Sequence, residues 1–78
     1  MEYQHLGNIY VIENGIIKML NKKNQLQQLI VIKHIAWIWN HLGLKRFEIH
    51  TSGGDPVPVF YPDFETAEKI LIEINKYI

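Results

Sequence analysis

Three side chains with acid, base and anion-binding chemistry recur at alternate positions in the segment LKRFEIHT. Arg46, Glu48 and His50 would share one face of an extended strand, because successive side chains of a strand point to opposite faces. Together they could hold an anionic ligand or transfer protons. We favour the simpler interpretation of a polar sheet face with cross-strand ion pairs. Phe60 keeps the ligand hypothesis open, because an aromatic ring beside Arg46 and His50 could stack a planar ligand.

The loop after this segment is Ser52-Gly53-Gly54-Asp55, which could present backbone N–H groups to an anion. It precedes a strand-like run rather than a helix, and it lacks the lysine of a phosphate-binding loop. A turn accounts for both glycines, so we predict a turn. Gly53 and Gly54 remain candidate anion contacts in an oligomer.

The four histidines do not form a metal-binding pattern. His34 and His41 are seven residues apart, about two turns of a helix, which is too far for both to bind one ion. The chain has no cysteine and therefore no thiolate site. No serine, cysteine or paired-carboxylate arrangement indicates nucleophilic catalysis. We expect no metal, no cofactor and no enzymatic activity.

Composition limits the class of partner. Seventy-eight residues predict one domain with a small core, and oligomerisation often supplements such cores. Eight basic and eight acidic residues give zero net charge, which argues against nucleic-acid binding. The basic residues that could serve it are Lys22, Lys23, Lys33, Lys45 and Arg46.

We expect a cytoplasmic location. The first 15 residues lack the basic and apolar layout of a signal peptide, and the near-apolar run at 29–39 is too short and polar to span a membrane. Isoleucine occurs 13 times, beside frequent Asn and Lys, which is typical of AT-rich bacterial and phage genes.

The segment NIYVIENGIIKML predicts a β-hairpin. Asn14-Gly15 favours a two-residue type I′ turn, with Glu13 opposite Ile16. This register places on one face Tyr10, Ile12, Ile17 and Met19, and on the other Ile9, Val11, Ile16, Lys18 and Leu20.

A helix is predicted over residues 25–42, with Asn24 as N-cap and Gly43 at the C-terminus. Polar residues occupy one helical sector and would fall on both faces of a strand: Gln27, Lys33, His34, Asn40 and His41. The β-branched residues favour the alternative, a strand over 29–39.

A second hairpin and a final helix follow. We predict Thr51 opposite Val57, with Pro58 either in an edge strand or at a bulge, because it cannot donate a hydrogen bond to the ladder. Asp63 is the expected N-cap of the helix. The predicted apolar stripe comprises Phe64, Ala67, Leu71, Ile74 and Ile78, widened by Ile70 and Tyr77. The ending FETAEKILIEI resembles the final helix of many short bacterial and phage sheet-plus-helix domains.

A shift of 40 residues aligns pseudo-repeats 8–42 and 44–78 within the single domain 1–78. The predicted fold is α+β: ββαββα, a four-stranded antiparallel sheet with two helices on one face. The alternative is a β-meander with a single C-terminal helix.

The uncovered sheet face would be about half apolar, which is typical of an interface. Candidate interface residues, including two from the helices, are Ile9, Val11, Ile16, Leu20, Pro58, Trp37 and Ile72. We expect a non-catalytic, homo-oligomeric interaction module, such as a phage or bacterial accessory inhibitor that binds a partner protein. The alternative is a protein that binds or sequesters a small anionic, nucleotide-like ligand between subunits, with candidate contacts Arg46, Glu48, His50 and Phe60.

Overall fold

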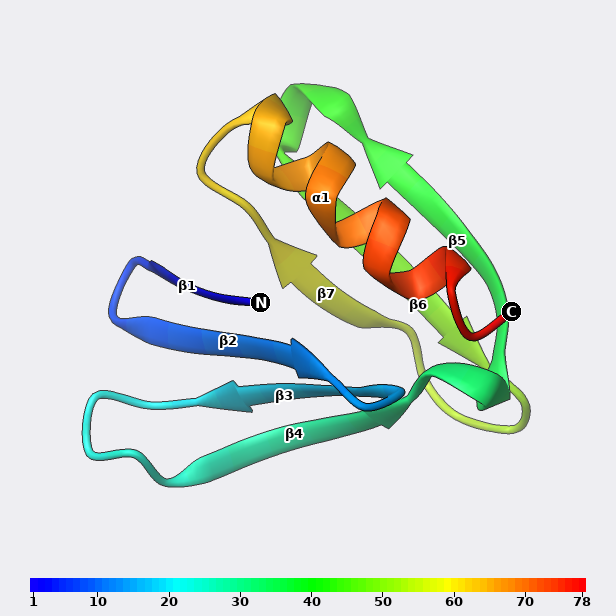
Figure 1. Cartoon of the computed structure of the whole chain (residues 1–78), viewed down its shortest axis with the longest axis horizontal. Coiled ribbons are helices and arrows are strands. Elements are labelled where there is room, and N and C mark those ends of the chain that lie inside the picture. The colour runs from blue at the N-terminus through cyan, green and yellow to red at the C-terminus, as the bar shows by residue number, and fades with distance from the viewer.

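A computed structural model describes residues 1–78 and contains seven strands and one α-helix. The strands form two antiparallel sheets, β1-β2-β3-β4 and β5-β6-β7. The strand bounds are β1 Glu2–His5, β2 Asn8–Glu13, β3 Ile16–Leu20, β4 Leu26–Val31, β5 Ile35–His41, β6 Arg46–Thr51 and β7 Val57–Phe60. Helix α1, Phe64–Asn75, runs along the second sheet (Figure 1). Single 3₁₀ turns, η1 Ile32–His34 and η2 Leu42–Leu44, follow β4 and β5.

The helix predicted over residues 25–42 is wrong, and with it the four-stranded sheet carrying two helices. The segment forms β4, η1 and β5, so the alternative of a β-meander with one C-terminal helix is confirmed. The polar pair Lys33-His34 lies exposed in η1, where the chain passes between the sheets. Asn40 points inward but accepts a hydrogen bond from the Tyr61 hydroxyl at 2.7 Å. Polar groups on both faces are therefore compatible with strands here.

The two halves of the chain do not share the strand–strand–helix order that the 40-residue shift predicts. Residues 29–31 belong to β4 and residue 32 to η1, whereas residues 69–72 lie in α1. The first half has no α-helix to match α1, since its equivalent segment pairs with β3 and β6.

The first hairpin has the predicted register. Glu13 pairs with Ile16, and the turn residues Asn14 and Gly15 have φ values of 52° and 77°. Positive φ at both positions is what a type I′ turn requires. The predicted inner face is confirmed: Tyr10, Ile12 and Ile17 are buried, and Met19 packs against them.

The second hairpin is displaced by two residues from the predicted register. Ile49, and not Thr51, pairs with Val57, and Phe47 pairs with Val59. An even displacement keeps every side chain on its predicted face. Phe47 and Ile49 are therefore still buried, and Pro58 lies in the edge strand β7 as predicted.

Helix α1 begins as predicted, because the Asp63 side chain accepts a hydrogen bond from the Thr66 amide at 2.8 Å. Its buried side differs from the predicted stripe. The buried residues are Ala67, Ile70 and Ile74, whereas the outer members of the stripe are exposed, namely Phe64, Leu71 and Ile78. The helix runs along the second sheet and also contacts β2 of the first sheet, so the row formed by Ala67, Ile70 and Ile74 faces the core.

Twelve buried residues from the strands, η1, the segment after β7 and α1 form one core. They are Tyr10, Ile12, Ile17, Ile30, Ile32, Phe47, Ile49, Val59, Tyr61, Ala67, Ile70 and Ile74. No helix of this structure has the length and apolar character that crossing a membrane requires.

Candidate functional site

The outer face of the second sheet carries the side chains with the most chemistry in the molecule. The inner face of this sheet is filled by core residues such as Phe47 and Ile49, so alternate residues must point outward. We define the aromatic–imidazole face as the outward-pointing residues Trp37, Trp39, His41, Arg46, Glu48, His50 and Phe60. Cross-strand pairing sets Trp37 beside His50, Trp39 beside Glu48, and His41 beside Arg46, which itself pairs with Phe60.

Both tryptophans of this face stack on imidazole rings. The ring centroids of Trp37 and His50 are 3.6 Å apart, with 9° between the ring planes. The centroids of Trp39 and His41 are 4.5 Å apart, with 28° between the planes. Trp37 is 52 % exposed and Trp39 is 55 % exposed. Each indole therefore has one side against an imidazole while the rest of the ring remains open to solvent.

Glu48 connects the two histidines. Its carboxylate lies 3.0 Å from Nε2 of His50 and 3.7 Å from Nε2 of His41. The hydrogen bond with His50 is the main reason that the pKa of Glu48 is lowered from its ordinary value, and the charges of both histidines act in the same direction. The five side chains Trp37, His50, Glu48, His41 and Trp39 thus form one continuous chain of contacts.

Arg46 provides an uncompensated positive charge at one end of this face. No carboxylate lies within 4.0 Å of its guanidinium, and its Nε atom is buried without a hydrogen-bond partner. The guanidinium carbon lies 6.0 Å from the centroid of the Phe60 ring, close enough for a cation–π contact. His5 stacks on the same Phe60 ring, with 6.4 Å between the two ring centroids.

The structure brings together four of the predicted ligand residues and separates two. Arg46, Glu48, His50 and Phe60 share the aromatic–imidazole face. Gly53 and Gly54 lie in the loop beyond the other end of β6 from Arg46, where Gly53 has a φ of 77° and serves the turn.

The predicted interface residues lie on three separate surfaces, because the chain forms two sheets where one was predicted. Trp37 and Pro58 belong to the second sheet, and Ile72 is exposed on α1. The remaining four lie on the outer face of the first sheet: Ile9, Val11, Ile16 and Leu20.

Trp39 and His41 were not predicted as site residues, because residues 25–42 were predicted to form a helix. The signal that identifies them is the alternation in WIWNH, where Trp37, Trp39 and His41 point outward and Ile38 and Asn40 point inward. A period of two over five residues indicates a strand.

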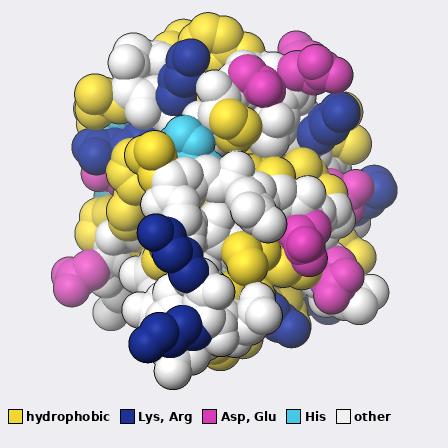
Figure 2. Space-filling view, turned by 90° about the vertical axis from the view of Figure 1, so that its left-hand side faces the viewer, with side chains coloured by type: hydrophobic (Ala, Val, Ile, Leu, Met, Phe, Trp, Pro, Cys, Tyr) yellow, Lys and Arg dark blue, Asp and Glu magenta, His cyan; other side chains and the backbone are white.

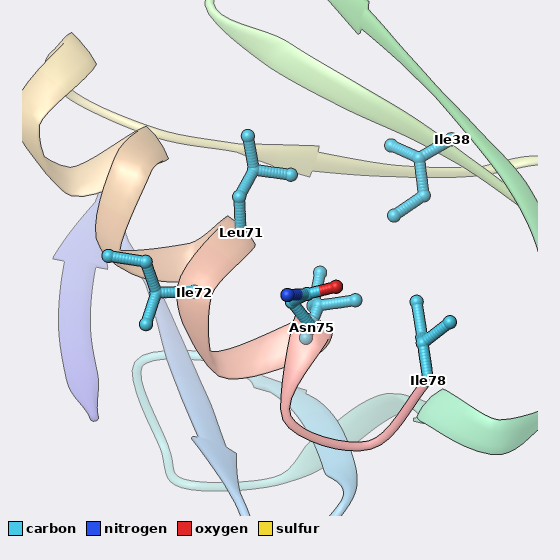
Figure 3. A pocket seen from close by; sticks show the side chains of 6 residues that line it. Ile38, Leu71, Ile72, Asn75 and Ile78 are labelled. Atoms are coloured by element: carbon cyan, nitrogen blue, oxygen red, sulfur yellow. The ribbon is translucent and has the colours of Figure 1, made fainter.

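Both hollows of the molecule lie away from the aromatic–imidazole face. The first, of about 370 Å³, is an open apolar groove between α1 and β5, lined by Ile38, Leu71, Ile72, Ile74, Asn75 and Ile78 (Figure 3). The second, of about 520 Å³, lies between β4 and the loop after β6 and includes Leu29, Lys33, His34 and Ser52. The aromatic–imidazole face is therefore an open surface and not a pocket. No group of three or more His, Cys, Asp or Glu residues is arranged to hold a metal ion.

Comparison with known proteins assigns no family to this architecture. No protein-family model, no curated protein and no solved structure matches the chain.

Proposed function

We propose that this protein is a non-catalytic binding module whose aromatic–imidazole face docks onto a partner protein. The observation that supports this most directly is the pair of half-exposed tryptophans, Trp37 and Trp39, on neighbouring outward positions of one strand. The open face of an antiparallel sheet usually carries polar residues. Tryptophan is enriched among the few interface residues that contribute most of the binding free energy.

The stacking contacts prepare the two indoles for binding. His50 and His41 hold the rings against the sheet, and Glu48 contacts both imidazoles. A side chain that is already ordered loses less conformational entropy when a partner covers it. The network therefore lowers the cost of burying the tryptophans in an interface.

The charge of the face specifies the chemistry of the partner. Glu48 contacts two histidines, whereas no carboxylate lies within 4.0 Å of the Arg46 guanidinium. Burying an unpaired guanidinium in an interface is costly, so the partner must supply a carboxylate. We infer a partner protein with an apolar patch for the indoles and an acidic residue at its edge, opposite Arg46.

A protein partner fits this surface better than the small anionic ligand or the nucleic acid considered above. Small-ligand sites are concave, and both hollows of the molecule lie elsewhere. Nucleic-acid interfaces are strongly basic, whereas this chain has zero net charge. Figure 2 shows basic side chains at several separate places on one side of the molecule, with acidic ones among them.

The experiment compares proteins captured by the tagged full chain from lysate of the cells that make it. Wild type is compared with Trp37→Ala/Trp39→Ala, and with Leu6→Ala, which removes a still more exposed apolar residue from the β1–β2 turn, outside this face. We expect a protein that binds wild type and Leu6→Ala but not the double variant. With the purified partner, each tryptophan variant should weaken Kd about 30-fold or more, which corresponds to about 2 kcal/mol.

Circular dichroism must show that the double variant is folded. Arg46→Ala should weaken the purified complex and reduce its salt dependence. Identical sets of captured proteins for wild type and the double variant would refute the proposal. A wild-type chain that instead retains an added mass of a few hundred daltons in native mass spectrometry would support the small-ligand alternative.

A further inference from the structure

A second exposed apolar surface lies on the outer face of the first sheet. We call it the aliphatic face; it comprises Ile9, Val11, Ile16, Leu20, Leu26, Leu29 and Val31. All seven retain solvent exposure, whereas the inward residues between them, such as Ile12 and Ile17, are buried. The face thus remains uncovered within one chain.

We propose that two copies of this protein associate through their aliphatic faces, around a two-fold axis that runs parallel to β2. The surface is distinct from the aromatic–imidazole face, so the proposal goes beyond the function proposed above and does not depend on it.

The extent of the aliphatic face suits a reversible dimer. With the axis over β2, the strands β1, β2 and β3 of the two copies overlap and β4 lies outside the contact. Three strands at a spacing of about 4.8 Å and five residues at about 3.3 Å each give a footprint of roughly 14 by 17 Å. Exposed apolar patches of a few hundred Å² often mark interfaces. Because side chains project from the sheet, two such faces bury more accessible surface than twice this footprint. The contact is still smaller than the roughly 1,200 Å² that stable complexes bury, which is typical of weak and reversible association.

The charges on the aliphatic face indicate that the molecule that binds it is a second copy of this chain. Glu2, Val11, Lys18 and Leu29 form one row across the four strands, because each pairs with the next. Neither Glu2 nor Lys18 has an ion-pair partner within the chain. Glu2 and Lys18 lie on opposite sides of Val11, and each is one strand spacing, about 4.8 Å, away from it.

A two-fold axis over Val11 and parallel to β2 places β1 of each copy above β3 of the other. Glu2 of each copy then faces Lys18 of the other across the spacing of about 10 Å between packed sheets, which two long side chains can bridge. The face is therefore complementary to itself, as a two-fold interface requires. An axis perpendicular to the strands would instead set Lys18 against Lys18.

The test is the dissociation constant of the full chain, measured by sedimentation over a concentration series. Wild type should be a reversible dimer. Glu2→Lys and Lys18→Glu should each weaken the dimer about tenfold or more, because each sets two like charges against each other twice in the symmetric contact. An equimolar mixture of the two variants should dimerise again, since the introduced lysine then faces the introduced glutamate.

Three further variants separate this surface from the others. Val11→Asp should give a folded monomer, whereas Leu71→Asp, on the exposed side of α1, should leave the dimer unchanged. Trp37→Ala/Trp39→Ala should also remain dimeric, so failure of the partner-binding proposal would be visible separately. A wild-type monomer at all concentrations, unchanged affinity in both charge variants, or a mixture that does not re-associate would overturn the proposal.

Discussion

The indole of Trp37 lies parallel to the imidazole of His50, with 3.6 Å between ring centroids and 9° between ring planes. Trp37 is on β5 and His50 is on β6, and the two residues are direct cross-strand partners. Aromatic pairs of this kind contribute about 0.5–1.5 kcal/mol beyond the burial of their surface. The contact therefore orders a tryptophan that would otherwise be a mobile surface side chain.

Removing the imidazole should release Trp37 without unfolding the protein. In a Trp39→Phe background, which leaves one tryptophan, His50→Ala should increase acrylamide quenching of fluorescence and reduce the near-ultraviolet circular dichroism of the indole. The free energy of unfolding should fall by about 0.5–1.5 kcal/mol. His34→Ala, which removes an exposed histidine in η1, is the matched control and should alter neither signal. Equal quenching in both variants would show that the stacking does not order Trp37.

Acid should weaken the contacts that the Glu48 carboxylate makes with His50 on the same strand and with His41 on β5. The folded-state pKa of Glu48 lies below its ordinary value of 4.5, mainly because His50 hydrogen-bonds to the carboxylate. The ionised form is thus favoured by folding, so its contribution to stability is fully present above about pH 4.5 and is lost as pH falls through the lowered pKa. Melting temperatures of wild type and Glu48→Gln, measured from pH 7 to pH 3, should differ at neutral pH and converge in acid. A gap that stays constant to pH 3 contradicts this assignment.

Two neighbouring isoleucines of α1 should respond very differently to truncation. Ile74 is 1 % exposed and Ile72 is 60 % exposed. Ile74→Ala should lower the free energy of unfolding by about 2–5 kcal/mol, because it leaves a cavity in the core. Ile72→Ala, the matched control, should change it by no more than about 0.5 kcal/mol. Urea denaturation measures both values, and comparable losses would place the buried side of the helix elsewhere.

Local chemistry allowed parts of this fold to be predicted correctly. Asn14-Gly15 favours positive φ at both turn positions, which sets the register of the first hairpin. The alternation around Phe47 and Ile49 identified the inner face of β6 even though its partner strand is displaced by two residues. Asp63 caps α1 through a hydrogen bond to an amide three residues away. Each of these features depends on residues that are close in the chain.

The sequence by itself therefore determined the first hairpin register, the faces of β6 and β7, and the start of α1. Tertiary structure decided the state of residues 25–42, because their polar spacing suits one side of a helix while their β-branched residues suit strands. The pairing of β4 with β3 and of β5 with β6 resolves that conflict. The inward-pointing Asn40 side chain accepts a hydrogen bond from the Tyr61 hydroxyl. That choice turned Trp37, Trp39 and His41 onto one face with Arg46, Glu48 and His50. Their proximity depends on hydrogen bonds between strands, which no local preference of the chain encodes.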